Sequence, residues 1–434
     1  MTNRQLFAAI GEIDDVIINE ASTARINSVK QPWLKFAGVA AAFALIIAGA
    51  VMLPKILAPV EPAPDLPKLN AAYENYNAMG FEGHMAYDIS ELNSGNPWDV
   101  NNKITQLPVF INTMIRDRYG LYDNGLTAEE MLEKVQQAAQ VLGLEVGESY
   151  TVPTLEQIEM ITEKIMSMGD YEGLEQDIAA NTAVQNATVK CTNGVRIEIT
   201  PDGYLRLYLT LETADLVYEA DKLLEISDSF VIWFDPVMQL PGEYNFTYDY
   251  AGDEQALEVT QYLLSQYGAF AGIQQPGYNL FADYNIYAER MLLYYTVFEN
   301  SGSPTEQLLN HQFNNIHFSP SDEGGMSAIR YNKTDLSELV GYYPIITAEE
   351  ARELLVSGEY YSSVPYDITG AENIGKVEMV YHTSPWNEMF IPYYKFYVEV
   401  ELGNLSAGMK QYGVYYVSAI HPDYIESTPI NIFN

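Results

Sequence analysis

The clearest fold signal in the chain is residues 187–211, which read ATVKCTNGVRIEITPDGYLRLYLTL. Every second residue is apolar in residues 195–199 and again in residues 205–211. A period of two is typical of a β-strand that buries one face. Asn193-Gly194 and Pro201-Asp202-Gly203 supply turn residues before and between the two runs. The stretch therefore predicts an antiparallel β-meander with one buried face.

Helices are predicted before and after this meander. Thr127 is followed by Glu130, and Thr347 is followed by Glu350, so both segments carry a capping box. In such a box the threonine hydroxyl accepts from the third helical amide while the glutamate reaches back to the cap. A third helix is predicted to begin at Asp253. Each of these helices is expected to end at a glycine, namely Gly143, Gly358 or Gly268.

Further strands are predicted near the C-terminus. Apolar residues alternate with polar or aromatic ones in residues 396–402, and residues 377–381 and 414–420 resemble neighbouring strands. A fourth helix is expected at about residues 154–168. The fold class is therefore predicted to be α+β, with helices packed on antiparallel β-meanders.

An apolar run precedes all of these elements, at residues 36–53 (FAGVAAAFALIIAGAVML). At about 1.5 Å per residue, and with Trp33 and Leu34 added, a helix here reaches the roughly 30 Å of a bilayer core. A buried core helix would need protein on every side. A cleaved signal peptide remains the alternative, although a leader of roughly 35 residues before the apolar run is long for one. We predict a transmembrane helix at residues 33–53.

The charges around this run predict its orientation. Arg25, Lys30 and Lys35 precede it, and Lys55 and Lys68 follow it, a slight bias that favours a cytosolic N-terminus. The rest of the chain is then exported, and the expected location is the cell membrane with a single pass. The predicted parts are a cytosolic segment (1–32), the span (33–53), a proline-rich stalk (54–68) and two α+β ectodomains (69–245 and 246–434).

The cytosolic segment contains the candidate site for a partner. Its apolar residues recur at helical spacing and form one stripe, made of Leu6, Ile10, Ile13 and Ile17. A short helix of this kind is marginal in water on its own. The stripe is therefore predicted to bind a cytosolic partner protein, and a passive tail that only directs membrane insertion is the alternative.

Composition excludes several classes of protein. The 434 residues include 22 Lys+Arg against 59 Asp+Glu, a net charge of −37, which argues against a nucleic-acid surface. The 48% apolar fraction excludes global disorder, and the length predicts two or three domains. Cys191 is the single cysteine, so no internal disulfide can form.

Motifs for catalysis, cofactors and metals are missing from the sequence. Residues 370–377 match the phosphate-binding P-loop until Val377, where a serine or threonine is required. His311 and His317 are expected in and beside a strand rather than as a metal pair. No catalytic, cofactor-binding or metal-ligating residue is predicted. Weak Ca²⁺ binding at acidic turns such as residues 322–325 and an aromatic platform for glycans remain open.

The N-terminus resembles a known group of proteins. Ile10-Gly11-Glu12-Ile13-Asp14-Asp15, Glu20-Ala21 and Trp33-Leu34-Lys35 before the apolar run resemble uncharacterised single-pass membrane proteins of clostridial bacteria. Some of those resemble membrane-bound partners of sigma factors. Near the C-terminus, Tyr343-Pro344-Ile345-Ile346 and Tyr394-Lys395-Phe396 are similar to PepSY-like extracytoplasmic modules. The resemblance implies a regulatory role and a sigma factor as the cytosolic partner.

We therefore expect a membrane-anchored extracytoplasmic sensor or regulatory protein that is not an enzyme. Its ectodomain is expected to contact a cell-envelope ligand, and its cytosolic segment a regulatory protein. The alternative is a tethered envelope protein that binds or processes glycan or peptide, in which residues 1–32 serve only membrane insertion.

Overall fold

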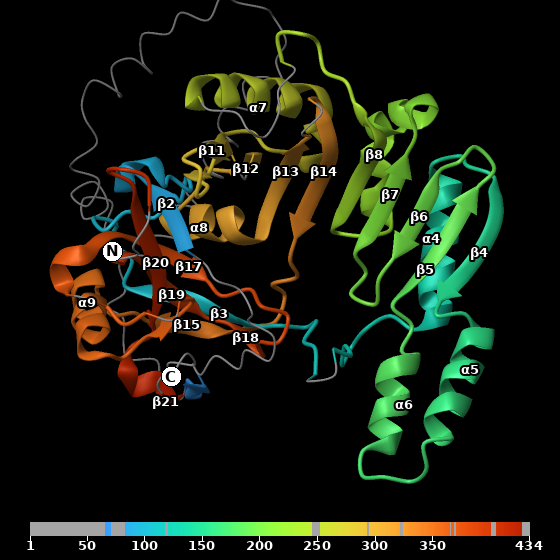
Figure 1. The fold of residues 1–434 in the computed structure, drawn as a ribbon, viewed down its shortest axis with the longest axis horizontal. Coiled ribbons are helices and arrows are strands. Elements are labelled where there is room, and N and C mark those ends of the chain that lie inside the picture. The colour runs from blue at the N-terminus through green and yellow to red at the C-terminus, as the bar shows by residue number, and fades with distance from the viewer. Residues whose placement is uncertain are drawn as a thin grey trace, which may run out of the picture. The chain divides into compact units, whose positions relative to one another are not determined.

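The computed structural model describes residues 66–434, except residues 71–82, 118–119, 245–251, 293–294, 322–323, 365, 369, 401–404 and 428–434. The described part combines helices and β-sheets, so the predicted α+β class is confirmed at this level (Figure 1). Residues Leu66–Asn434 form one compact unit.

The largest sheet has nine strands in the order β4-β5-β6-β7-β8-β14-β13-β12-β9 (Figure 1). Neighbouring strands are antiparallel, except that β7 and β8 are parallel. The predicted meander is β5, β6 and β7 and is confirmed. The nine strands are β4 (Val146–Val152), β5 (Asn186–Cys191), β6 (Arg196–Ile199), β7 (Leu205–Leu209), β8 (Phe230–Met238), β9 (Pro276–Asn279), β12 (Tyr295–Glu299), β13 (Asn314–Pro320) and β14 (Met326–Lys333).

The alternating residues of the meander point into a core on one face of this sheet. Ile197, Ile199 and Leu207 are fully buried there. Helices α4 (Ala128–Val141) and α7 (Asp253–Tyr267), together with the 3₁₀ segment η2 (Leu211–Glu225), contribute residues to the same core. The predicted alternation extends one residue too far, because Leu211 begins η2 and is 62% exposed.

The C-terminal strands form further sheets. Residues 377–381, 396–402 and 414–420 were predicted as neighbours, and the sheet order β16-β20-β19-β17 confirms that these strands pair. The strands of this sheet are β16 (Tyr361–Ser362), β17 (Ile374–Tyr381), β19 (Pro392–Val400), β20 (Lys410–Ser418) and β2 (Gly83–Ala86), which pairs with β20. A three-stranded sheet contains β3 (Gln106–Ile111), β15 (Leu339–Pro344) and β18 (Met389–Phe390). Two pairs complete the strands: β1 (Leu69–Asn70) with β21 (Ile425–Ser427), and β10 (Ala282–Tyr284) with β11 (Arg290–Leu292).

The four predicted helices are confirmed as α4, α5 (Leu155–Met166), α7 and α9 (Ala348–Ser357). Both predicted capping boxes are present, at Thr127 with Glu130 and at Thr347 with Glu350. Sequence reasoning missed α6 (Leu174–Thr182) and α8 (Pro304–Phe313), although Ser303 and Glu306 form a capping box before α8. The remaining short 3₁₀ turns are η1 (Ile89–Glu91), η3 (Ala269–Ala271), η4 (Ala371–Asn373) and η5 (Pro422–Tyr424).

Two further predictions concern the division of the chain. Strands from both sides of the predicted boundary between residues 245 and 246 share the nine-stranded sheet, since β8 pairs with β14. The predicted cytosolic segment (1–32), the span (33–53) and residues 54–65 of the stalk lie outside the described residues. Within the part of the chain that the structure describes, no helix is both long and apolar enough to cross a membrane.

Candidate functional site

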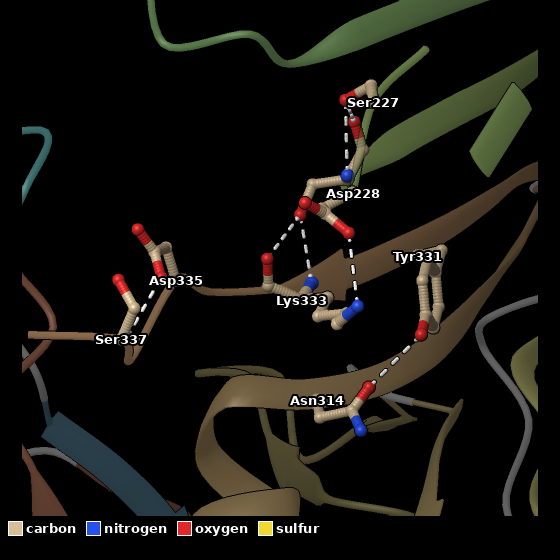
Figure 2. A network of polar contacts seen from close by, with 8 residues as sticks. Ser227, Asp228, Asn314, Tyr331, Lys333, Asp335 and Ser337 are labelled. Atoms are coloured by element: carbon tan, nitrogen blue, oxygen red, sulfur yellow. Dashed lines mark hydrogen bonds and ion pairs between the residues drawn. The ribbon is translucent and has the colours of Figure 1, made fainter. Parts of the chain in front are cut away.

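The candidate site lies where β14 ends and the chain leads on to β15 of the three-stranded sheet. Two clefts, of about 610 Å³ and 400 Å³, are both lined by Asp228, Lys333, Thr334 and Asp335. The segment from Lys333 to Asp335 therefore borders both hollows. Its polar contacts are drawn in Figure 2.

Backbone hydrogen bonds place the two charged residues of this site. The turn between η2 and β8 contains Ser227, Asp228 and Ser229, and the end of β14 contains Lys333. The Lys333 backbone amide donates to Ser229 Oγ at 2.9 Å, and that hydroxyl donates back to the Lys333 carbonyl at 3.0 Å. Ser227 Oγ lies 2.6 Å from the Gly203 carbonyl oxygen and so fixes the turn against β7. These contacts bring Asp228 to the end of β14.

Asp228 and Lys333 form an exposed ion pair. Lys333 Nζ donates to Asp228 Oδ1 at 3.0 Å, and the side chains are 52% and 74% exposed for Lys333 and Asp228 (Figure 2). This hydrogen bond raises the pKa of Lys333, which is charged at neutral pH. An exposed pair of this kind contributes only about 0–1 kcal/mol to stability, so both groups are available to a ligand at little energetic cost.

The other groups of the larger cleft are amides, apolar side chains and two further carboxylates. Asn314 accepts from the Tyr331 hydroxyl at 3.2 Å, as Figure 2 shows, and Leu309, Phe313 and Leu336 are among the apolar lining residues. A mixed lining of this kind suits a ligand with both hydrogen-bonding groups and apolar surface.

The carboxylates Asp335 and Glu306 of this cleft are held in their ionised form. The Ser337 backbone amide donates to Asp335 Oδ1 at 2.9 Å and lowers the pKa of Asp335. The backbone amide of Ser303 lowers the pKa of Glu306 in the same way, through the capping box of α8. General acid catalysis at neutral pH needs a carboxyl with a raised pKa, so neither of these two groups is suited to act as a general acid.

A second polar cluster surrounds Glu378 on β17, where the side chain is 6% exposed. Lys376 Nζ lies 2.6 Å from Glu378 Oε1, and Ser94 and Tyr397 donate to the carboxylate at 2.6 and 3.1 Å. Burial pushes the pKa of Glu378 upward, but Lys376, Ser94 and Lys395 outweigh it, so the pKa is lowered and the carboxylate is ionised. Since its oxygens are occupied by protein donors, this cluster is assigned to structure.

The structure places the other residues singled out in the sequence apart from this site. His311 lies in α8 with Nε2 3.1 Å from the Ser94 carbonyl, and His317 lies in β13 with Nδ1 3.0 Å from Thr296 Oγ1. Within the described residues there is no group of three or more side chains suited to a metal ion. Cys191 is buried in β5, and burial raises the pKa of its thiol.

Two predicted motifs remain, the near match to a P-loop and the apolar stripe of the N-terminal segment. Residues 370–377 lead into strand β17 rather than a helix, which agrees with the rejection of a P-loop. The predicted partner-binding residues Leu6, Ile10, Ile13 and Ile17 lie outside the described residues, and their role stays a prediction.

Sequence reasoning missed the Asp228–Lys333 site. The two residues are 105 positions apart, and neither belongs to a motif. The one available signal was the capping box of Ser303 and Glu306, which predicts α8 beside the larger cleft. In comparisons with known protein families, curated proteins and solved structures, the chain matches none.

Proposed function

We propose that this protein is a single-pass membrane protein whose extracytoplasmic part binds a cell-envelope ligand without catalysing a reaction. In this proposal the ligand enters the clefts around Asp228 and Lys333. The stripe of Leu6, Ile10, Ile13 and Ile17 then reports to a cytosolic regulatory protein such as a sigma factor.

One observation carries the binding part of the proposal. The chain passes from β14 of the nine-stranded sheet to β15 of the three-stranded sheet through residues 334–338, and Lys333, Thr334 and Asp335 at the start of this connection line both clefts. A ligand that contacts this connection touches the link between two sheets. Occupation of the cleft could thus alter how the sheets are held, which is what a sensor requires.

The lining favours a peptide or glycan as the ligand. Asn310 and Asn314 offer amide groups, the Asp228–Lys333 pair offers one charge of each sign, and Leu309 and Phe313 offer apolar surface. The lowered pKa values of Glu306 and Asp335 argue against a general-acid role for these two carboxylates in the alternative function, which is processing of the ligand.

Binding can be tested with the full chain in lipid nanodiscs. The probe is a soluble enzymatic digest of cell wall that contains glycan fragments and their peptides, and calorimetry measures the affinity. Lys333→Met should weaken binding roughly fivefold or more, because one charged donor is lost. Lys164→Met, at an exposed position of α5, is the matched control and should bind as the wild type does. Equal binding by the Lys333 variant, or none by the wild type, would refute the proposal.

The cytosolic part needs a separate test. Replacing Ile13 and Ile17 by Asp puts two charges into the apolar stripe without changing residues 33–53. We expect a crosslinked pull-down from wild-type cells to contain a cytosolic protein that the double variant loses. If both samples contain the same proteins, residues 1–32 serve insertion alone.

A further inference from the structure

The outer face of the nine-stranded sheet, opposite its apolar core, carries a row of aligned side chains. The strand register places Glu198 opposite Arg206, Arg206 opposite Val231, and Val231 opposite Arg330. Residues in register on neighbouring strands project from the same face. Arg206 and Arg330 therefore stand on one face, two strands apart, at about 10 Å between their backbones.

This row is positively charged in a protein of net charge −37. Glu198 pairs with Arg196 at 3.3 Å and with Arg206 at 3.8 Å, so one carboxylate serves two guanidinium groups. Arg330 is exposed, and among the described residues it forms no ion pair with a carboxylate. The row thus holds more positive charge than its own carboxylate can neutralise.

Tyr204 lies beside the two arginines. It directly precedes β7, two residues before Arg206, and the positive charges of Arg330 and Arg206 and the negative charge of Asp202 all act on its phenol. Burial nevertheless raises the pKa of Tyr204 to about 12, so the hydroxyl keeps its proton at neutral pH. The hydroxyl is shielded from solvent and lies against Arg330, so it belongs to the surroundings of that guanidinium group and does not reach a ligand on the surface.

Val231 lies between the two arginines in the row and is 2% exposed, whereas the Arg206 side chain is 38% exposed and Arg330 is exposed. Guanidinium groups donate paired N–H bonds to oxyanions, and two such groups match the several oxygens of a phosphoryl group better than the two of a carboxylate.

We propose that Arg206 and Arg330 form a binding site for a phosphate group on the outer face of the sheet. The phosphate can be free or can be carried by an envelope polymer, since the same donors would recognise either. This site is separate from the clefts around Lys333 and does not depend on the function proposed for them.

Phosphate binding is tested with the full chain in nanodiscs of uncharged lipid, with inorganic phosphate as the probe and ³¹P NMR as the readout. Arg206→Gln and Arg330→Gln should each weaken binding about tenfold, the effect of losing a charge-assisted donor. Arg352→Gln is the matched control, because Arg352 is 41% exposed and Arg206 is 38% exposed.

Two further arms identify the chemistry and its source. Acetate should compete poorly with inorganic phosphate. If the natural ligand is a polymer, a soluble polymer with phosphodiester groups should also compete. If the natural ligand is free phosphate, the polymer should not compete. Circular dichroism checks that each variant is folded. Unchanged binding in both arginine variants, equal competition by acetate, or no binding by the wild type would overturn the proposal.

Discussion

Glu378 in the C-terminal sheet and Glu198 in the meander have similar neighbours in sequence but different surroundings in the fold. Each has a basic residue two positions earlier, Lys376 and Arg196, and each pairs with it. Each also accepts from a tyrosine hydroxyl of the next strand, Tyr397 at 3.1 Å and Tyr208 at 3.2 Å.

The difference lies in what covers them. Ser94, which is 284 positions away in sequence, donates to Glu378, and the Leu92 carbonyl accepts from Lys376 at 2.6 Å. Glu198 is itself 12% exposed, but its partners Arg196 and Arg206 are 44% and 38% exposed. The same strand pattern therefore gives a buried structural ion pair in one sheet and an ion pair whose cations reach the solvent in the other.

The largest expected effect is on the buried pair. Lys376→Met leaves the Glu378 carboxylate buried without its cation, which should reduce the free energy of unfolding by about 3 kcal/mol. Urea denaturation of the full chain in detergent measures this loss. A loss below about 1 kcal/mol would mean that water reaches Glu378 and that the two glutamates are alike.

A second prediction concerns His317, which lies beside Arg330 at the covered end of the outer face. Burial and then Arg330 lower the pKa of His317 to about 4. Its folded pKa lies below its unfolded value of about 6.5, so the unfolded chain takes up the proton first and stability falls as the pH falls from about 6.5 to 4. His317→Gln should remove part of this fall, on the order of 2–3 kcal/mol.

The control for this titration is His421→Gln, because the His421 side chain is 45% exposed. Equal pH profiles for the wild type and the His317 variant would show that His317 is not shielded from solvent.

The smallest expected effect is at Glu198, whose side chain is 12% exposed but whose arginine partners are 44% and 38% exposed. Glu198→Gln should change the free energy of unfolding by no more than about 1 kcal/mol, because Arg196 and Arg206 can be hydrated in its absence. The same variant should bind inorganic phosphate more tightly, since a competing carboxylate has been removed. A large destabilisation would place Glu198 in the same class as Glu378.

These two sheets also explain which parts of the fold could be predicted from sequence. The meander buries one face, so its alternation of apolar and polar residues is clear and its strands were placed correctly. In β19 and β20 both faces are largely buried, as Tyr397 and Phe396 at 1% exposure illustrate. The sequence predicts these strands, but it does not show which of their two faces packs into the core, because both faces carry buried residues.

The candidate sites depend on contacts between distant residues. Asp228 meets Lys333 only because β8 pairs with β14, and Arg206 aligns with Arg330 only through β8. Periodicity and capping signals act within about a dozen residues and carry no information on such pairing. The local elements were therefore predictable, whereas the groups that they bring together were not.

The most direct test of the account is the topology of the full chain. With epitope tags at both ends and expression in a Gram-positive host, protease is added to intact protoplasts. The account predicts that residues 66–434 are degraded while the N-terminal tag is protected, because residues 33–53 anchor the chain with its N-terminus in the cytosol. A released protein that begins after Ala58, or a C-terminal tag that survives the protease, would contradict it.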